Sequence, residues 1–116
     1  MHSIKEVRDD FLSESHEDFV GLWSLIWRIK NEMGATDPKS VRAHSMEILR
    51  ELLSEGLIKA GMPNEEGELA EWQENSEQIV KRIEGEWDQL GREPDIGDIV
   101  WFTTTEKGNT HIEQRF

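Results

Sequence analysis

The segment SHEDFVGLWSLIWRIKNEMG, residues 15–34, has the broadest apolar surface in this chain of 116 residues. Its large apolar side chains recur every three or four positions, which predicts an α-helix. Six of them fall on one face and three more flank it: Phe19, Leu22, Trp23, Ile26, Ile29 and Met33, then Val20, Leu25 and Trp27. So wide an apolar surface is typical of a helix buried on more than one side. We therefore expect residues 19–33 to form the central helix, with Ser15 as its N-cap.

Two helices are predicted beside this segment by their start and stop signals. Ser3 and Glu6 have the spacing of a capping box, which predicts a short helix over residues 4–12. Asp37 followed by proline predicts the start of another helix. That helix should end near residue 55, because Gly56 suits the left-handed position that follows a helix.

A further helix and a few strands complete the pattern. Ser76 is the expected N-cap of a helix that ends at Gly91. We expect this helix and the one that ends near residue 55 to pack on the central helix. Three segments resemble strands, with the second also able to remain a loop: residues 57–61, 69–72 and 98–104. Helices grouped around a small antiparallel sheet indicate an α+β fold.

The chain length predicts one domain over residues 1–116. Its two ends are the parts that we expect to be most mobile. The N-terminal one is the helical segment 1–14. The C-terminal one is the tail 105–116, whose Gly108-Asn109 pair predicts either a hairpin turn or the start of a frayed end.

The acids of this chain are concentrated in its second half. Residues 64–77 contain six glutamates and no basic residue. Up to Pro63 there are 11 acids and 8 bases, a net charge of −3, whereas the remainder has 14 acids and 5 bases, a net charge of −9. A field of this density repels phosphate backbones and attracts basic protein surfaces. We therefore expect a basic protein partner and no nucleic acid.

Composition excludes several other classes of protein. There is no cysteine, so disulfides and thiol chemistry are impossible and a reducing cytoplasm is the expected location. We see neither a signal peptide nor a membrane span, so no membrane partner is expected. The four histidines lack metal-ligand spacing, and no nucleophile elbow or phosphate-binding loop occurs. We therefore expect no catalytic residues, no metal ligands and no cofactor, and an oligomeric state that the sequence leaves open, with a homodimer among the possibilities.

A metal-dependent enzyme is one alternative. Asp95 and Asp98 precede an expected strand and Glu106-Lys107 follows it, which partly matches the acid and acid-x-lysine pattern of nucleases. The match fails because no residue separates Glu106 from Lys107. His44, at the edge of a helical stripe, is better explained as a boundary residue, and it would be the candidate base only in such an enzyme.

A winged-helix regulator is the other alternative. The expected helix before Gly56 and the strand after it resemble the recognition helix and first wing strand of such proteins. Lys39, Arg42 and Arg50 lie along that helix, but so do three glutamates, and the wing would be the acidic segment itself. A wing that approaches phosphates should be basic.

By its size, its acidity and its lack of catalytic residues, the chain resembles the small immunity proteins of bacterial polymorphic toxin systems, including those of contact-dependent inhibition. This resemblance implies a non-enzymatic inhibitor that binds a basic toxin or nuclease domain. The binding face would present an acidic rim around one aromatic anchor, Trp72. Two alternatives remain open: Trp72 packs partly against the domain, and the acidic segment is a solvated loop. The expected partner-binding residues are Glu65, Glu66, Glu68, Glu71, Trp72 and Glu74.

Overall fold

The structure, a computed structural model, describes residues 2–115 as five helices and a four-stranded antiparallel sheet. The predicted α+β class is therefore confirmed. The helices are α1 (Ile4–Glu17), α2 (Leu22–Glu32), α3 (Pro38–Ser54), α4 (Ser76–Leu90) and α5 (Glu106–Arg115). The strands are β1 (Val20–Gly21), β2 (Ile58–Pro63), β3 (Leu69–Glu71) and β4 (Trp101–Thr104). None of the helices in the described part is long and apolar enough to cross a membrane.

The sheet has the strand order β1-β4-β2-β3 and every neighbouring pair is antiparallel. β2 and β3 form a hairpin, while β4 lies between β1 and β2. The expectation that residues 57–61 and 98–104 share one small sheet is therefore confirmed, although the second strand begins only at Trp101. Before it, Ile99 has a φ of 71°, a left-handed conformation that is strained for a β-branched residue.

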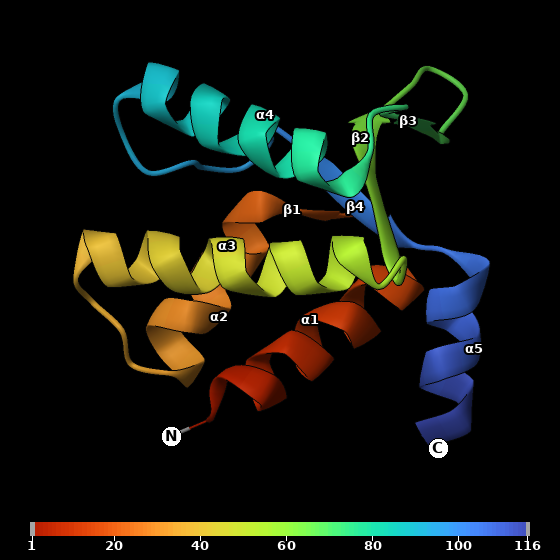
Figure 1. The fold of residues 1–116 in the computed structure, drawn as a ribbon, viewed down its shortest axis with the longest axis horizontal. Helices are drawn as coiled ribbons and strands as arrows, with labels where there is room; N and C mark the ends of the chain where they lie inside the picture. The colour runs from red at the N-terminus through yellow and green to blue at the C-terminus, as the bar shows by residue number, and fades with distance from the viewer. Residues whose placement is uncertain (1, 116) are drawn as a thin grey trace.

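Helix α3, and not α2, occupies the centre of the helical layer. In Figure 1 α3 crosses the middle of the molecule, with α4 above it and α1 and α2 below. The contacts agree, because α3 packs against α1, α2, α4 and β2. The expectation that both neighbouring stripes pack on the helix around residues 19–33 is therefore wrong for α4, whose apolar face lies on α3.

The chain breaks between α1 and α2 at a place that the sequence pattern does not mark. Ser15 is not an N-cap: it is buried inside α1 and its hydroxyl donates to the Phe11 carbonyl oxygen at 2.8 Å. Helix α1 continues to Glu17 and ends at the extended residue Asp18. Val20 then pairs with Phe102 of β4. This strand pairing divides what the periodicity predicts as one helix.

Helices α1 and α5, which occupy most of the two segments that we expect to be mobile, both place apolar side chains in the core. On α1, Val7, Phe11 and Leu12 are at most 1% exposed, and the Phe11 ring meets the Phe102 ring edge to face at 5.9 Å. Residues 106–115 form α5 rather than the second strand of a hairpin, and Ile112 of α5 is buried. The last residue of the expected tail, Phe116, lies outside the described residues.

Gly108 misleads a sequence-based prediction because its role is tertiary. Helix α5 begins after Thr105, whose hydroxyl accepts a hydrogen bond from the Gly108 N–H at 3.0 Å. A Cβ at Gly108 would collide with the backbone carbonyl of Leu57. The glycine therefore allows the helix to approach the start of β2 closely, and it does not form a turn.

The start and stop signals of the other helices are largely confirmed. Ser3 and Glu6 form the expected capping box, and Asp37 caps α3 with its carboxylate on the Ser40 N–H. Gly56 is left-handed, and the N–H of the next residue donates to the Leu52 carbonyl in a Schellman arrangement. Helix α4 is capped one residue earlier than predicted, by Asn75 in a capping box with Gln78.

Replacement of Ile26 by Ala should lower the free energy of unfolding by about 2–5 kcal/mol, because this α2 side chain is 2% exposed and its removal leaves a cavity. Trp27→Ala, at the next position of α2, is the control. Trp27 is 54% exposed, so its loss should cost less than about 1 kcal/mol. Urea titration measures both values, and equal losses would contradict the burial of this face of α2.

Two Gly→Ala substitutions in helices should have effects of opposite sign. Gly108→Ala should destabilise the protein by about 1–3 kcal/mol, since α5 must move away from the Leu57 carbonyl. Gly85→Ala in α4 meets no atom within 4 Å and should stabilise it by about 0.5–1 kcal/mol. Hydrogen exchange should show loss of protection in α5 for Gly108→Ala alone. If Gly108→Ala is as stable as the wild type, the close approach of α5 to the Leu57 carbonyl does not require glycine at this position.

Candidate functional site

The acidic segment forms the tip of the β2–β3 hairpin, and one side chain organises it. Asn64 accepts hydrogen bonds on Oδ1 from the N–H groups of Glu66, at 3.0 Å, and Glu68, at 2.9 Å. The Asn64 N–H donates to the Glu68 carbonyl oxygen at 2.8 Å. The tip is therefore held by local hydrogen bonds that leave the glutamate side chains free to face solvent.

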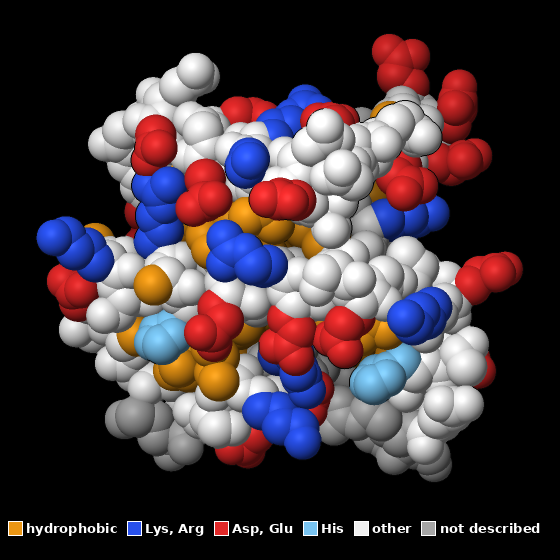
Figure 2. Space-filling view, in the orientation of Figure 1, with side chains coloured by type: hydrophobic (Ala, Val, Ile, Leu, Met, Phe, Trp, Pro, Cys, Tyr) orange, Lys and Arg blue, Asp and Glu red, His pale blue; other side chains and the backbone are white. Residues whose placement is uncertain are grey.

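Four hairpin glutamates are exposed and make no ion pair with any residue of the described part: Glu65, Glu66, Glu68 and Glu71. Figure 2 shows acidic side chains gathered at the upper right, over the hairpin, where they stand out from the body of the molecule. Elsewhere many acids are paired with arginine or lysine. These four residues, which we call the hairpin glutamates, are thus an uncompensated negative surface.

Trp72 and Glu74 do not belong to that surface in the way that the sequence predicts. The Trp72 ring is 9% exposed and belongs to the hydrophobic core. The Arg82 guanidinium lies 3.6 Å from the ring centroid, and Arg82 also binds Glu74 at 3.1 Å. Of the two interpretations that the sequence leaves open for Trp72, the exposed anchor is wrong and packing against the domain is confirmed. Trp72 fixes the base of the hairpin, and Glu74 has a cation of its own.

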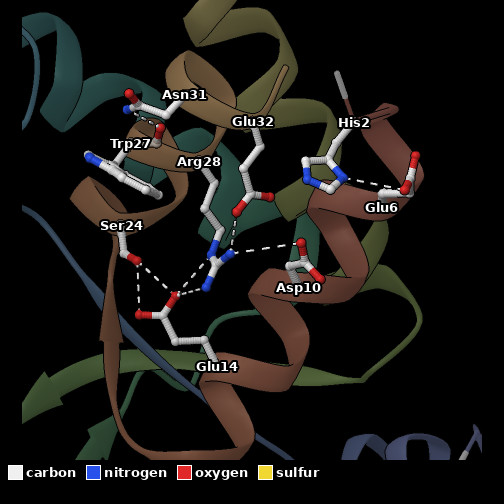
Figure 3. Close-up of polar contacts among 9 residues, drawn as sticks. All are labelled: His2, Glu6, Asp10, Glu14, Ser24, Trp27, Arg28, Asn31 and Glu32. Carbon is white, nitrogen blue, oxygen red and sulfur yellow. Dashed lines mark hydrogen bonds and ion pairs between the residues drawn. The ribbon is translucent and has the colours of Figure 1, made fainter. Parts of the chain in front are cut away.

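A second polar cluster, between α1 and α2, is centred on Arg28 (Figure 3). The guanidinium donates from two nitrogens to Glu14 Oε1, at 3.0 and 2.9 Å, and from a third to Glu32 Oε2, at 2.6 Å. It also lies 3.9 Å from Asp10 Oδ2. The Ser24 hydroxyl donates to Glu14 at 2.9 Å. One cation is therefore shared by three carboxylates from two helices.

Glu32 is the unusual member of this cluster. Burial raises the pKa of its carboxyl above the ordinary value of 4.5, the contact with Asp10 raises it further, and Arg28 opposes the rise. The side chain is 16% exposed. Its second oxygen, Oε1, is buried and receives no hydrogen bond. A buried carboxylate oxygen without a donor is costly, so this atom needs an explanation.

His2 completes the cluster from the N-terminal segment. Its backbone N–H donates to the Glu32 carbonyl oxygen at 2.8 Å, which ties the segment to the end of α2. Its ring Nδ1 lies 3.3 Å from Glu6 Oε2. Ligand atoms of His2, Asp10 and Glu32 all lie within 4.8 Å of one another. Within residues 2–115 these three form the group of potential metal ligands that the fold brings together.

Sequence motifs could not identify this cluster, because its members lie at positions 2, 10 and 32 in three different segments. One signal was present. Glu6, Asp10 and Glu14 follow each other at four-residue intervals, and so do Arg28 and Glu32, which places each set on one helical face. That spacing marks two charged stripes but does not say that they meet.

Of the residues that a metal-dependent enzyme would use, Asp95 and Asp98 have structural partners. Asp98 accepts hydrogen bonds from Arg92, at 2.9 Å, and from the Asp95 N–H, at 2.8 Å, while the Asp95 carboxylate accepts one from the next N–H. These bonds hold the loop before β4. The Asp95 N–H, and after it Arg92, lower the pKa of the Asp98 carboxyl. Glu106 is exposed in the first turn of α5 and His44 is half-buried on α3, so neither extends an Asp95–Asp98 site.

The cations that a winged-helix protein would use are divided between two environments. Arg42 is bound to Asp88 and lies over the Trp87 ring, 5.4 Å from its centroid. With Lys39 it borders a hollow of about 360 Å³ between α3 and α4. Arg50 is exposed. Arg42 is therefore committed to its contacts with α4.

Comparisons with protein-family models, with curated proteins and with solved structures found no match to this chain.

Replacement of Arg28 by Gln should lower the free energy of unfolding at pH 7 by about 1–3 kcal/mol, because it leaves partly buried carboxylates without their cation. Arg50→Gln is the matched control and should change it by less than about 0.5 kcal/mol, since Arg50 is exposed.

The effect of Arg28→Gln should also depend on pH. Arg28 lowers the pKa of Glu32, so its removal raises that pKa further. A carboxyl whose pKa is higher in the folded than in the unfolded state costs stability above the folded pKa, and this cost is gone below the unfolded value. The difference between variant and wild type should therefore shrink between pH 7 and pH 4. If urea titrations give the same difference in the free energy of unfolding at pH 7 and pH 4, the charge of Glu32 is not the cause of the destabilisation.

Proposed function

We propose that this protein is a non-enzymatic protein-binding module that recognises a basic protein through the hairpin glutamates. The observation that carries the proposal is their isolation: Glu65, Glu66, Glu68 and Glu71 project from one hairpin and none is paired with a cation of the described chain. Like charges so close together repel each other, and a cationic partner would relieve that repulsion.

The negative charge of the hairpin glutamates suggests the class of partner. A basic nuclease or toxin domain carries its cations where it binds nucleic acid, so the hairpin would bind at the same place and block it. The expected role is therefore that of an inhibitor or immunity protein. Absence of cysteine supports action in the reducing cytoplasm, where such a toxin would meet its target.

The burial of Trp72 changes how this binding would work. The ring cannot insert into a partner, so the tryptophan would serve by holding the hairpin in place beneath Arg82. Recognition would then depend on long-range attraction and on charge-assisted hydrogen bonds to the glutamates. Such binding is fast to form and sensitive to salt.

The hairpin glutamates should control the rate of association with a basic domain. We would measure this rate by biolayer interferometry against two immobilised, catalytically inactive ribonuclease domains of high isoelectric point, at 50 and 300 mM salt. Replacement of all four by Gln should slow association at low salt by about tenfold or more and flatten its salt dependence. In a separate assay with the active forms of the same ribonucleases, the wild type should inhibit cleavage and the four-fold variant should not.

Net charge alone must be separated from the hairpin surface. A second variant replaces four other glutamates that are exposed and make no ion pair within the described chain: Glu17, Glu47, Glu55 and Glu113. It has the same net charge as the hairpin variant and should associate nearly as fast as the wild type. Equal slowing in both variants, or no binding of the wild type to either domain, would refute the proposed site.

A further inference from the structure

The cluster between α1 and α2 holds a histidine in a defined position. Its backbone bond to the Glu32 carbonyl fixes where His2 lies, and the contact of Nδ1 with Glu6 fixes how the ring is turned. Figure 3 shows the ring between the two acids, with one nitrogen toward Glu6 and the other toward Glu32. The position is thus maintained by two independent contacts.

The contact with Glu6 also selects the tautomer. A carboxylate only accepts hydrogen bonds, so Nδ1 is the ring nitrogen that carries the proton. In the neutral ring Nε2 then has a lone pair, which faces carboxylate oxygens of Glu32 and Asp10. Three acceptors directed at one another repel each other unless a cation lies between them.

The Glu32 carboxylate also indicates a cation next to His2 Nε2. Its Oε2 is bound by Arg28, whereas its Oε1 is buried and has no donor. Asp10, whose side chain is half-exposed, contributes a carboxylate oxygen from the neighbouring helix α1. Glu32, with its orphaned Oε1, therefore lies beside the His2 ring and the Asp10 carboxylate, and the ligand atoms of these three residues are within 4.8 Å of one another.

The charges around this position favour a cation. Three carboxylates, those of Asp10, Glu14 and Glu32, surround the single guanidinium of Arg28. A fourth, that of Glu6, lies on the other side of the His2 ring. Arg28 approaches Glu32 through the opposite oxygen, so it leaves the His2 side open. A bound divalent ion would neutralise an excess of negative charge that the arginine does not.

We propose that His2 Nε2, an Asp10 carboxylate oxygen and Glu32 Oε1 bind a divalent transition-metal ion of the zinc type. One imidazole and two carboxylates suit zinc better than magnesium, which prefers oxygen ligands alone. Glu6 acts as the carboxylate that orients the histidine, an arrangement found in most histidine-metal sites. Three protein ligands leave a fourth position for water. The site is separate from the hairpin and does not depend on the function proposed for it.

Isothermal titration of the protein with zinc chloride at pH 7.5 tests this proposal. The wild type should bind one ion tightly enough to give a resolved 1:1 step. His2→Gln and Glu32→Gln should each weaken binding more than tenfold. His2 is exposed, so its variant should keep the circular dichroism spectrum of the wild type even if Glu32→Gln loses stability.

Glu6→Gln tests the orientation of the ring. A glutamine keeps the capping box, because it can still accept from the Ser3 N–H. Its amide would donate to Nδ1 and move the ring proton to Nε2, so zinc affinity should fall by about tenfold to a hundredfold. Nitrogen NMR of the His2 ring should show a lone pair on Nε2 without metal and a zinc-induced shift of that atom.

His111→Gln, on α5, and the four-fold hairpin variant are the controls, and both should bind zinc like the wild type. The proposal is overturned if the wild type shows no zinc step, if His111→Gln weakens binding as much as His2→Gln, or if the hairpin variant abolishes it. A proton on Nε2 that persists in saturating zinc would also overturn it, because a proton would then fill the position between the acids.

Discussion

Strand β4 is the element on which the rest of the structure depends. It pairs with β1 on one side and with β2 on the other, so it joins the N-terminal half of the chain to the hairpin. Its Phe102 is fully buried against Phe11 of α1. The carbonyl of Val100, just before the strand, accepts the first N–H of α2 at 3.3 Å. Without β4 the short strand β1 and the β2–β3 hairpin would no longer belong to one sheet.

Much of the fold could be predicted from sequence because many of its signals are local. The capping boxes, the Asp37-Pro38 start and the Gly56 stop each act within one turn of a helix. The division between α1 and α2 is different. It depends on the pairing of Val20 with Phe102, which is distant in sequence, and the local pattern of apolar residues continues through it. Tertiary pairing there overrides helical periodicity.

Helix α5 is a second element that local sequence signals do not predict, because here a helix forms where they indicate a turn. Gly108-Asn109 has the composition of a turn, yet it lies in the helix that begins after Thr105. Asn109 accepts a hydrogen bond from Thr104 and lies 2.7 Å from His16 Nδ1 on α1. Its partners are thus on two other elements. No local rule contains this information.

The hairpin glutamates and the cluster around Glu32 also differ in how far they can be predicted from local sequence. The hairpin glutamates lie close together in sequence and can be recognised by their charge alone. Trp72, in contrast, packs into the core and lies beneath Arg82 of α4, which is distant in sequence. The cluster around Glu32 combines three segments, so its charges became visible only once α1 and α2 were packed together. Local chemistry therefore predicts an exposed surface more easily than a site assembled between elements.

The lengths of the strands have a consequence for association. The two strands at the edges of the sheet, β1 and β3, have only two and three residues. The Glu71 carbonyl of β3 also accepts a hydrogen bond from the Gln73 side chain at 3.1 Å. A short edge offers few backbone groups to a foreign strand. Extension of this sheet by another chain, and with it fibril-like stacking, is therefore disfavoured, and a partner at the hairpin must be selected by side chains.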